Sequence, residues 1–258
     1  MTVYKIKDVE LEKYLKVVIR RDMVKDEAQH WEEAYLREFG ESLCKRFEEE
    51  IFCIRLRKKI HFCQLKRNYG IEINEEEMEK EVDDLMKNYQ EQLDALRYFY
   101  GAAKDAEAVT QIRVIEAKKK YRGIAKRIHP DVNPLTAFDK PLQELWEKTA
   151  AAYAKYDVEA LETIRIMVDK RLNELGENDD ETEYEIEDIE EKIEKIQLEI
   201  DHIINTDPYQ FGIFLLQEDL VREKHEELEE AILQYQQLSI ELQNILENLL
   251  SGGDVTVI

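Results

Sequence analysis

The sequence predicts an all-α protein, and three observations support this fold class. Glu, Lys, Leu and Ile are abundant, whereas only 8 Gly and 4 Pro interrupt the 258 residues. Apolar residues recur every three or four positions along most of the chain, which is the period of an amphipathic helix. Hydrophobic residues make up 43% of the sequence, enough to bury a core, so disorder throughout the chain is excluded.

The overall charge limits the classes of partner. A formal net charge of −22 at pH 7 repels phosphates, which argues against binding to nucleic acid or to an anionic membrane. The opening stretch MTVYKIKDVELEKY lacks the apolar core of a signal peptide, and no run of about 18 apolar residues follows. We therefore expect a cytoplasmic protein with no nucleic-acid and no membrane partner.

The three cysteines predict no metal site. Cys44, Cys53 and Cys63 form an odd set in a chain without a secretory signal, which favours reduced thiols. His61 and Cys63 are two residues apart and would point to different faces of a helix, unlike the usual zinc-ligand spacings. We expect neither a metal nor a cofactor.

Residues 1–95 are predicted to form a region of long helices. Apolar positions at helical spacing indicate a first helix over about 8–39 and a second over about 41–69. Gly40 and Gly70 follow these two segments, and we interpret both as C-caps.

A third long helix is predicted to begin after Asn74. Its side chain can cap the helix, and Glu77 three residues later completes a capping-box pattern. The helix should reach about Tyr100, where Gly101 marks a break.

Three shorter helices are predicted in the middle of the chain. The first covers about 104–128 and is ended by Pro130, and the second covers about 142–156. Asp157 can cap the third, which continues to Gly176.

The C-terminal part predicts an antiparallel coiled-coil hairpin over 177–250. Residues 174–194 hold twelve acids against one base, which alone would suggest a disordered block. Isoleucines nevertheless follow a heptad pattern there, at Ile186, Ile189, Ile193, Ile196, Ile200 and Ile203. A similar seam runs through about 215–250 after a short loop, so the two helices should pair. Residues 251–258 are expected to be a mobile tail.

The predicted hairpin leaves the oligomeric state open. Pairing within one chain and pairing between two copies bury the same seam, so a monomer and a homodimer both fit. The second helix is the longer of the two, and its end should pack on another element or on another chain.

One segment reverses the charge balance of the chain. Residues 113–127 contain a single acid, Glu116, among seven bases: Arg113, Lys118, Lys119, Lys120, Arg122, Lys126 and Arg127. Solubility does not explain such a local inversion. We interpret it as a basic helical face for an acidic partner, since complementary charge speeds encounter and fixes register.

The basic helix should end in a stiff, exposed loop. Pro130 lacks a backbone donor and disfavours helical geometry at His129, and Pro134 restricts Asn133 in the same way. Between the prolines, His129 and Asp131 would form a rigid recognition element, because stiffness reduces the entropy lost on binding.

Three interpretations of HPDVNP compete. It could be only a turn rich in turn-forming residues. It could be a catalytic His–Asp pair, but no nucleophile motif, phosphate-binding Gly loop or metal-binding motif accompanies it. We therefore do not expect an enzyme. The third interpretation comes from a resemblance to a known family.

The run EAKKKYRGIAKRIHPDVNP resembles helix II and the HPD loop of the J domain of DnaJ-type co-chaperones, whose pattern is KKxYRxLAxxxHPD. The matching positions are Lys118, Lys119, Tyr121, Arg122, Ala125, His129, Pro130 and Asp131, with Ile124 in the usual leucine place. Further on, LWEKTAAAYAKYDVEAL resembles helix III of the same domain. The resemblance therefore implies a central J-domain-like helical unit, which we assign to 96–176.

The resemblance is weaker at its front and covers about 96–168. Where the family has a short helix I with a YxxLG motif, this chain offers Tyr100 and Gly101 with a longer connection, so helix I would come from the third long helix. The Gly/Phe-rich linker and the CxxCxGxG zinc motifs of DnaJ are absent from the sequence. The chain would be a divergent member.

The resemblance also implies a function. A J domain binds a DnaK-type chaperone and stimulates its ATP hydrolysis, so that client protein is held. Here His129, Pro130 and Asp131 would trigger hydrolysis, and docking would fall to five bases: Lys118, Lys119, Arg122, Lys126 and Arg127. A client would bind the N-terminal helices or the hairpin. The alternative is a helical coiled-coil scaffold or interaction protein whose J-like segment has no such activity.

Overall fold

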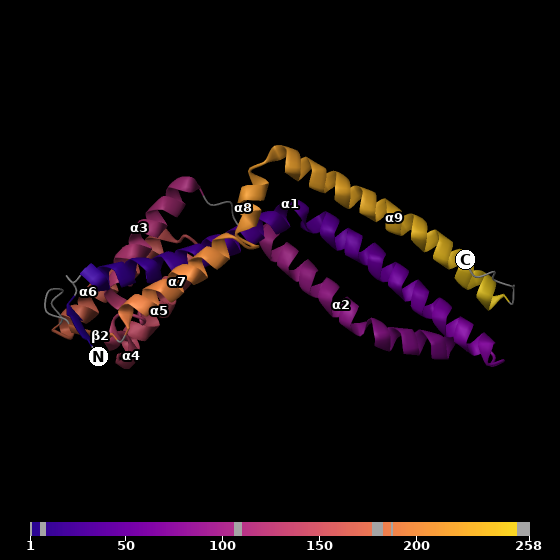
Figure 1. The fold of residues 1–258 in the computed structure, drawn as a ribbon, viewed down its shortest axis with the longest axis horizontal. Helices are drawn as coiled ribbons and strands as arrows, with labels where there is room; N and C mark the ends of the chain where they lie inside the picture. The colour runs from indigo at the N-terminus through magenta and orange to yellow at the C-terminus, as the bar shows by residue number, and fades with distance from the viewer. Residues whose placement is uncertain (1, 6–8, 106–109, 177–182, 187, 252–258) are drawn as a thin grey trace. The chain divides into compact units, whose positions relative to one another are not determined.

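The computed structural model describes residues 2–5, 9–105, 110–176, 183–186 and 188–251, and the fold is all-α, as predicted (Figure 1). The long helices are α1 (Val9–Asn68), α2 (Glu75–Asp105) and α9 (Glu218–Leu250). The shorter ones are α3 (Gln111–Ile128), α4 (Pro134–Phe138), α5 (Lys140–Tyr153), α6 (Val158–Glu174), α7 (Ile189–Ile204) and α8 (Gln210–Leu215).

The chain divides into two compact units that are each discontinuous in sequence. Unit 1 contains Met1–Trp31 and Glu107–Gln210, and unit 2 contains Glu32–Ala106 and Phe211–Ile258. Helix α1 contributes its first part to unit 1 and its remainder to unit 2. These units divide the chain differently from the boundaries expected from the sequence.

Helix α1 is one helix, whereas two were predicted. It passes through Gly40 without a break, so the C-cap assigned there is wrong. A Cβ at Gly40 would overlap the ring of Tyr100 on α2, which shows that this glycine serves close packing within unit 2. Gly70, by contrast, has a φ of 66° just beyond the end of α1, as a C-cap requires.

The predicted start of α2 is confirmed, but its predicted end is not. The side chain of Asn74 accepts a hydrogen bond from the backbone N–H of Glu77 at 3.1 Å, as the capping pattern indicated. The helix then continues through Gly101 to Asp105. The last turns of α2, where helix I of a 96–176 unit was expected, belong to unit 2, whereas α3 belongs to unit 1.

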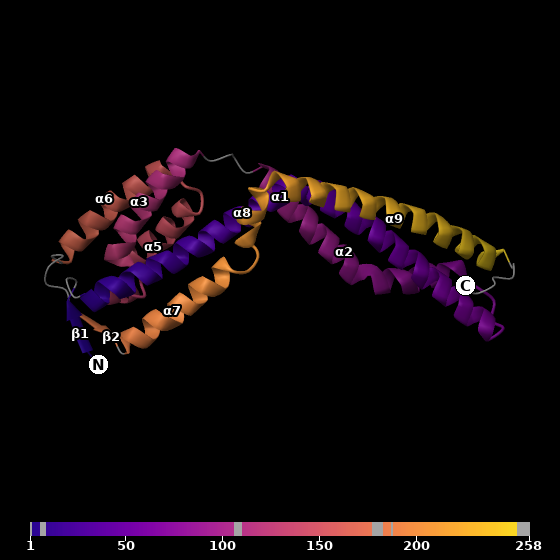
Figure 2. The same cartoon turned by 45° about the horizontal axis from the view of Figure 1, so that its top comes forward.

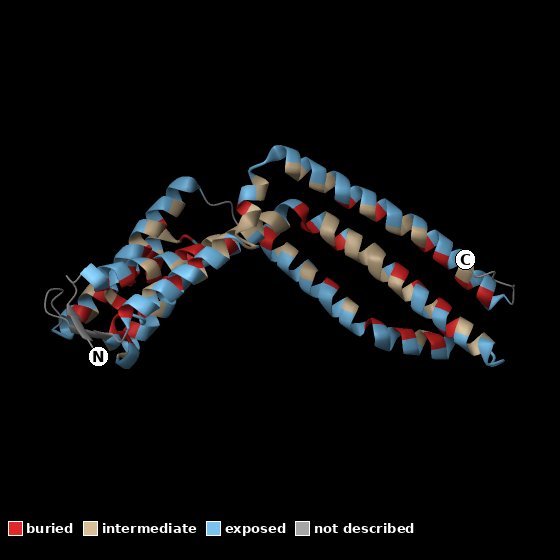
Figure 3. Ribbon diagram, viewed as in Figure 1, coloured by how far each residue is buried: buried red, intermediate tan, exposed pale blue. Residues whose placement is uncertain are grey.

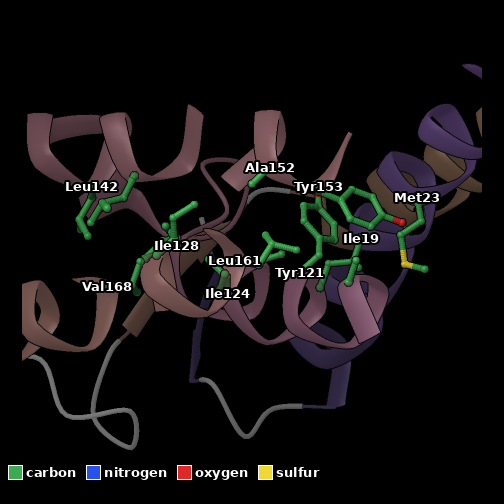
Figure 4. Packing of buried hydrophobic residues seen from close by; sticks show 14 of the residues in the cluster. Ile19, Met23, Tyr121, Ile124, Ile128, Leu142, Ala152, Tyr153, Leu161 and Val168 are labelled. Atoms are coloured by element: carbon green, nitrogen blue, oxygen red, sulfur yellow. The ribbon is translucent and has the colours of Figure 1, made fainter. Parts of the chain in front are cut away.

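Apolar side chains from four helices form the main core of unit 1 (Figure 4). Ile19 and Met23 of α1 pack with Tyr121 and Ile124 of α3. The other members come from α3, α5 and α6, among them Ile128, Leu142, Tyr153, Leu161 and Val168. Each fully buried large apolar side chain contributes about 1.5–3 kcal/mol. The first part of α1 thus completes the core around α3.

The predicted hairpin of α7 and α9 is wrong for the described residues. The isoleucines of α7 pack against Leu11, Leu15 and Val18 of α1 within unit 1. The seam of α9 packs with residues of α1 and α2 within unit 2. Figure 2 shows α9 running alongside the later part of α1. Each seam packs on a different part of α1, because apolar residues recur along this helix both in 11–24 and in 53–63.

Two short strands were not predicted. Strand β1 (Thr2–Lys5) pairs with β2 (Glu183–Ile186) in antiparallel register, with Thr2 opposite Ile186. The heptad seam therefore loses Ile186 and begins at Ile189, after Asp188 with a φ of 50°. Of the predicted tail, 252–258 lies outside the described residues.

Buried residues follow the inner faces of the helices, and the outer faces are exposed (Figure 3). None of the described helices has both the length and the apolar composition needed to span a membrane.

Candidate partner-binding site

Helix α3 ends where the prolines predicted. Its last residue is Ile128, and His129 adopts extended geometry with φ −63° and ψ 126°, which the residue before a proline favours. The backbone N–H of His129 still donates to the carbonyl of Ala125 at 3.0 Å. We call His129, Pro130 and Asp131 the tip of α3.

Side chains beyond the tip hold it in place. The last carbonyls of a helix lack partners within the helix. Here the carbonyl of Arg127 accepts a hydrogen bond from Asn133 Nδ2 at 2.6 Å, and the carbonyl of Ile128 accepts one from Thr136 Oγ1 at 3.0 Å. Asn133 also caps α4, through a hydrogen bond from the backbone N–H of Leu135 at 2.9 Å. These bonds agree with the predicted stiffness of the loop.

The exposure predicted for the tip is correct for Pro130 and Asp131 but wrong for His129. The His129 residue is 2% exposed, and its ring lies edge-on against Trp146 of α5 with 4.5 Å between ring centroids. Its burial has a long-range cause, since α1 packs beside α3 in the same unit and covers the ring with Asp22.

Both ring nitrogens of His129 have partners. The backbone N–H of Asp131 points at Nδ1 at 3.1 Å, and a backbone amide can only donate. Nδ1 must therefore accept, which assigns the ring proton to Nε2. Nε2 lies 2.8 Å from Asp22 Oδ2 and donates to it. This network fixes both the tautomer and the orientation of the ring.

Asp22 is the centre of the contacts between α1 and the tip. Oδ2 also accepts a hydrogen bond from the Tyr121 hydroxyl at 3.1 Å, and Oδ1 accepts one from Arg21 Nη2 at 2.8 Å. Burial raises the pKa of Asp22, but the hydrogen bond from His129, together with the charge and hydrogen bond of Arg21, lowers the pKa below its ordinary value. Asp22 is thus held as a carboxylate.

Arg21 links Asp22 to the other end of the tip. The same Nη2 donates to Asp131 Oδ2 at 3.0 Å, so one guanidinium bridges two carboxylates. Together with the bond from the Asp131 amide to His129, this closes a ring of contacts through both helices.

Arg21 and Asp22 were not among the residues predicted for the site. They lie about a hundred residues before the tip, and nothing local links them to it. One signal was present in the sequence: Asp22 continues the apolar stripe of Leu11, Leu15 and Val18 by four residues. A carboxylate on a buried stripe needs a polar partner.

Four bases of α3 are paired with acids inside unit 1. Lys118 contacts Glu27 of α1 at 2.6 Å, and three further bases contact acids of α6. These three pairs are Arg113 with Glu159, Lys120 with Glu162 and Arg127 with Asp169. The predicted docking residues Lys118 and Arg127 are thus half-buried and face other helices of the same unit.

The remaining bases lie on one exposed side of α3. Lys119, Arg122 and Lys126 are exposed and follow one another at three- and four-residue steps, which places them on one face. The same spacing continues backwards to Ile115 and Ile112, which are 58% and 70% exposed. We call these five residues the stripe of α3.

Among the described residues, no three His, Cys, Asp or Glu side chains are grouped to hold a metal ion. Comparison with known proteins finds no matching family model, no matching curated protein and no matching solved structure. A function therefore has to be inferred from the tip, the stripe and their contacts.

Proposed function

We propose that this chain is a co-chaperone of the J-domain type, which docks on a DnaK-type chaperone and stimulates its ATP hydrolysis. One observation carries the proposal. The basic part of the stripe leads along α3 directly into a rigid tip, on which Pro130 and Asp131 are exposed. The resemblance of this segment to helix II and the HPD loop supports the same function.

Electrostatics gives the stripe its specificity for an acidic surface. The chain carries a net charge of −22, so an acidic partner is repelled by most of it. Lys119, Arg122 and Lys126 supply a local attraction that selects one orientation. The exposed Ile112 and Ile115 add apolar contact area at the far end of the stripe.

The partner supplies the nucleotide and the catalytic groups. This chain would act by binding one conformation of the partner more tightly than the other, which shifts the partner toward its hydrolytic state. It is therefore proposed as a regulator and not as an enzyme. A cytoplasmic location belongs to the same proposal.

We propose that three of the five predicted bases dock. Lys119, Arg122 and Lys126 are available to a partner. Lys118 and Arg127 are engaged with Glu27 and Asp169 and would instead keep α3 in place within unit 1.

The alternative function, a helical scaffold with an inactive J-like segment, is favoured by one observation. His129 is buried, so a partner cannot reach its ring while α1 is in place. The proposed function survives this observation only if His129 acts through the shape of the tip.

Single-turnover ATP hydrolysis by a purified DnaK-type chaperone tests the proposal. We expect the full chain to stimulate hydrolysis, and His129→Gln to abolish the stimulation. No stimulation of any cognate chaperone would favour the scaffold. Stimulation that persists in His129→Gln would show that the tip does not carry the activity.

A second measurement tests the stripe. The double variant Lys119→Glu/Arg122→Glu should weaken binding at least tenfold at low salt and less at high salt, because salt screens exposed charges. The control Lys140→Glu/Lys170→Glu changes the net charge equally at two exposed lysines outside the stripe. Equal effects of the two double variants would show that overall charge, and not the stripe, governs binding.

A further inference from the structure

We propose that Asp22 and Arg21 of α1 are positioning residues of the partner-binding tip, so that the site extends beyond the J-like segment. This inference rests on the proposed function. Asp22 would set the ring of His129, and Arg21 would set the carboxylate of Asp131. Neither residue belongs to the segment that resembles a J domain.

The first step runs from Asp22 to the backbone of the tip. Asp22 accepts a hydrogen bond from the N–H of His129 Nε2, which keeps the ring proton on Nε2 and leaves Nδ1 unprotonated. Nδ1 is thereby free to accept the N–H of Asp131, two residues along the chain. The orientation of the peptide between Pro130 and Asp131 therefore depends on a carboxylate of another helix.

The second step concerns the exposed carboxylate of the tip. Arg21 Nη2 lies 3.0 Å from Asp131 Oδ2, and the Arg21 side chain is only 18% exposed. The Asp131 side chain is 41% exposed, so a partner can still contact it. The guanidinium is planar and bridges two carboxylates, and this fixes the direction in which Asp131 points.

Helix α1 could either position the tip or cover it so that a partner cannot bind, and the burial of α1 distinguishes these two roles. Ile19 and Met23, which flank this part of α1, belong to the core formed by α3, α5 and α6. Uncovering His129 would require these side chains to leave that core. Pro130, Asp131 and the basic part of the stripe are already exposed with α1 in place. A partner can therefore bind while α1 stays where it is.

Positioning makes a specific kinetic prediction. If only a fraction of molecules has the tip in the competent geometry, the apparent dissociation constant rises by the inverse of that fraction. Asp22→Asn in the full chain should therefore raise the half-saturating concentration for chaperone stimulation about tenfold or more. The maximal rate at saturation should fall far less.

The control is Asp26→Asn, one turn further along α1. Asp26 is also a shielded carboxylate, but its partners are His30 and Tyr156 and not the tip. It should leave the half-saturating concentration within about twofold. Arg21→Gln is a second variant at a partly exposed site, and it should also raise that concentration, so the test survives if Asp22→Asn fails to fold.

The side-chain ¹⁵N shifts of His129 give a readout that does not involve the chaperone. The intact chain should show the tautomer protonated at Nε2, and Asp22→Asn should show mixed tautomers, whereas Asp26→Asn should match the intact chain. If the intact chain stimulates no chaperone, the proposed function fails, and these shifts still decide the positioning.

Two kinetic results would overturn the inference. An unchanged half-saturating concentration in both Asp22→Asn and Arg21→Gln would show that α1 does not position the tip. Stronger stimulation in either variant would show that α1 masks the tip.

Discussion

The carboxylate of Asp22 and the ring of His129 are 2.8 Å apart, although 107 residues separate them in the sequence. This contact joins the first part of α1 to the end of α3 inside one unit. The conformation of the loop after α3 consequently depends in part on a helix near the start of the sequence.

The Asp22 contact should make the stability of unit 1 depend on pH. The pKa of Asp22 is lower in the folded state than in the unfolded state. Its contribution to stability is therefore fully present above the unfolded-state pKa of about 4, and it is lost as the pH falls through the folded-state pKa. Asp22→Asn should lower the free energy of unfolding by about 1–3 kcal/mol at pH 7. In urea unfolding the difference should shrink below pH 4, and a constant difference down to pH 3 would contradict the assignment.

Asp26 should have the opposite dependence on pH. Burial raises the pKa of Asp26 to about 6, although His30 and a hydrogen bond with Tyr156 lower it. The folded state binds the proton of Asp26 more tightly than the unfolded state does, so ionisation of Asp26 lowers the free energy of unfolding. This loss develops as the pH rises from about 4 to about 6.

The measurement for Asp26 is urea unfolding of Asp26→Asn from pH 4 to pH 7. Relative to the intact chain, the variant should gain on the order of 1 kcal/mol over this range. The charged neighbours Lys118 and Glu27 are unchanged in the variant. A relative stability that falls with pH would show that the carboxylate is favoured in its charged form.

The hydroxyl of Thr136 should contribute more to the stability of unit 1 than the hydroxyl of an exposed threonine does. It is 1% exposed, and its hydroxyl satisfies the otherwise unpaired carbonyl of Ile128. Thr136→Val should cost about 1–3 kcal/mol, because a buried carbonyl loses its partner. Thr163 on α6 is the control, since its exposed hydroxyl bonds a carbonyl of its own helix. Similar effects of Thr136→Val and Thr163→Val in thermal unfolding would contradict the capping role.

Two helical glycines should respond in opposite directions to alanine. Alanine normally stabilises a helix by about 0.8–1 kcal/mol relative to glycine. Gly101 on α2 has open space at the Cβ position, so Gly101→Ala should stabilise unit 2. At Gly40 the added methyl would overlap Tyr100, so Gly40→Ala should destabilise it. Equal melting-temperature shifts would show that packing at Gly40 is loose.

The segment with the resemblance should fold poorly alone. Residues 96–176 lack Asp22, as well as Ile19 and Met23, which complete the core beside Tyr121. We expect weak protection of the tip amides in hydrogen exchange, and a peptide of residues 9–31 should restore protection. An Asp22→Asn peptide is the matched control and should restore less at the tip. Full protection of the segment alone would show that α1 is dispensable.

Local signals in the sequence predicted much of the fold. Pro130 correctly located the end of α3, and Asp157 caps α6 through a hydrogen bond from the Ala160 amide at 2.9 Å. Such features depend on a few neighbouring residues, so they can be found without knowing the tertiary structure. Gly40 and Gly70 have the same sequence signal, and only the packing against Tyr100 separates them.

Long-range pairings could not be predicted in the same way. The isoleucine seam of α7 would fit any apolar stripe of similar length. The sequence predicted that it pairs with the helix over about 215–250, but it packs on α1. The same limit applies to the candidate site. The basic face and the tip were found from local residues, whereas the burial of His129 depends on Asp22.

The division of α1 between two units affects how the protein is made. Helix α1 is synthesised before the helices on which its apolar faces pack, which are α2, then α3, then α7 and finally α9. At about 5–20 residues per second, the 107 residues between Asp22 and His129 take roughly 5–20 s to synthesise. During that time the apolar face of α1 that packs on α3 stays exposed, and such a transiently exposed surface favours aggregation.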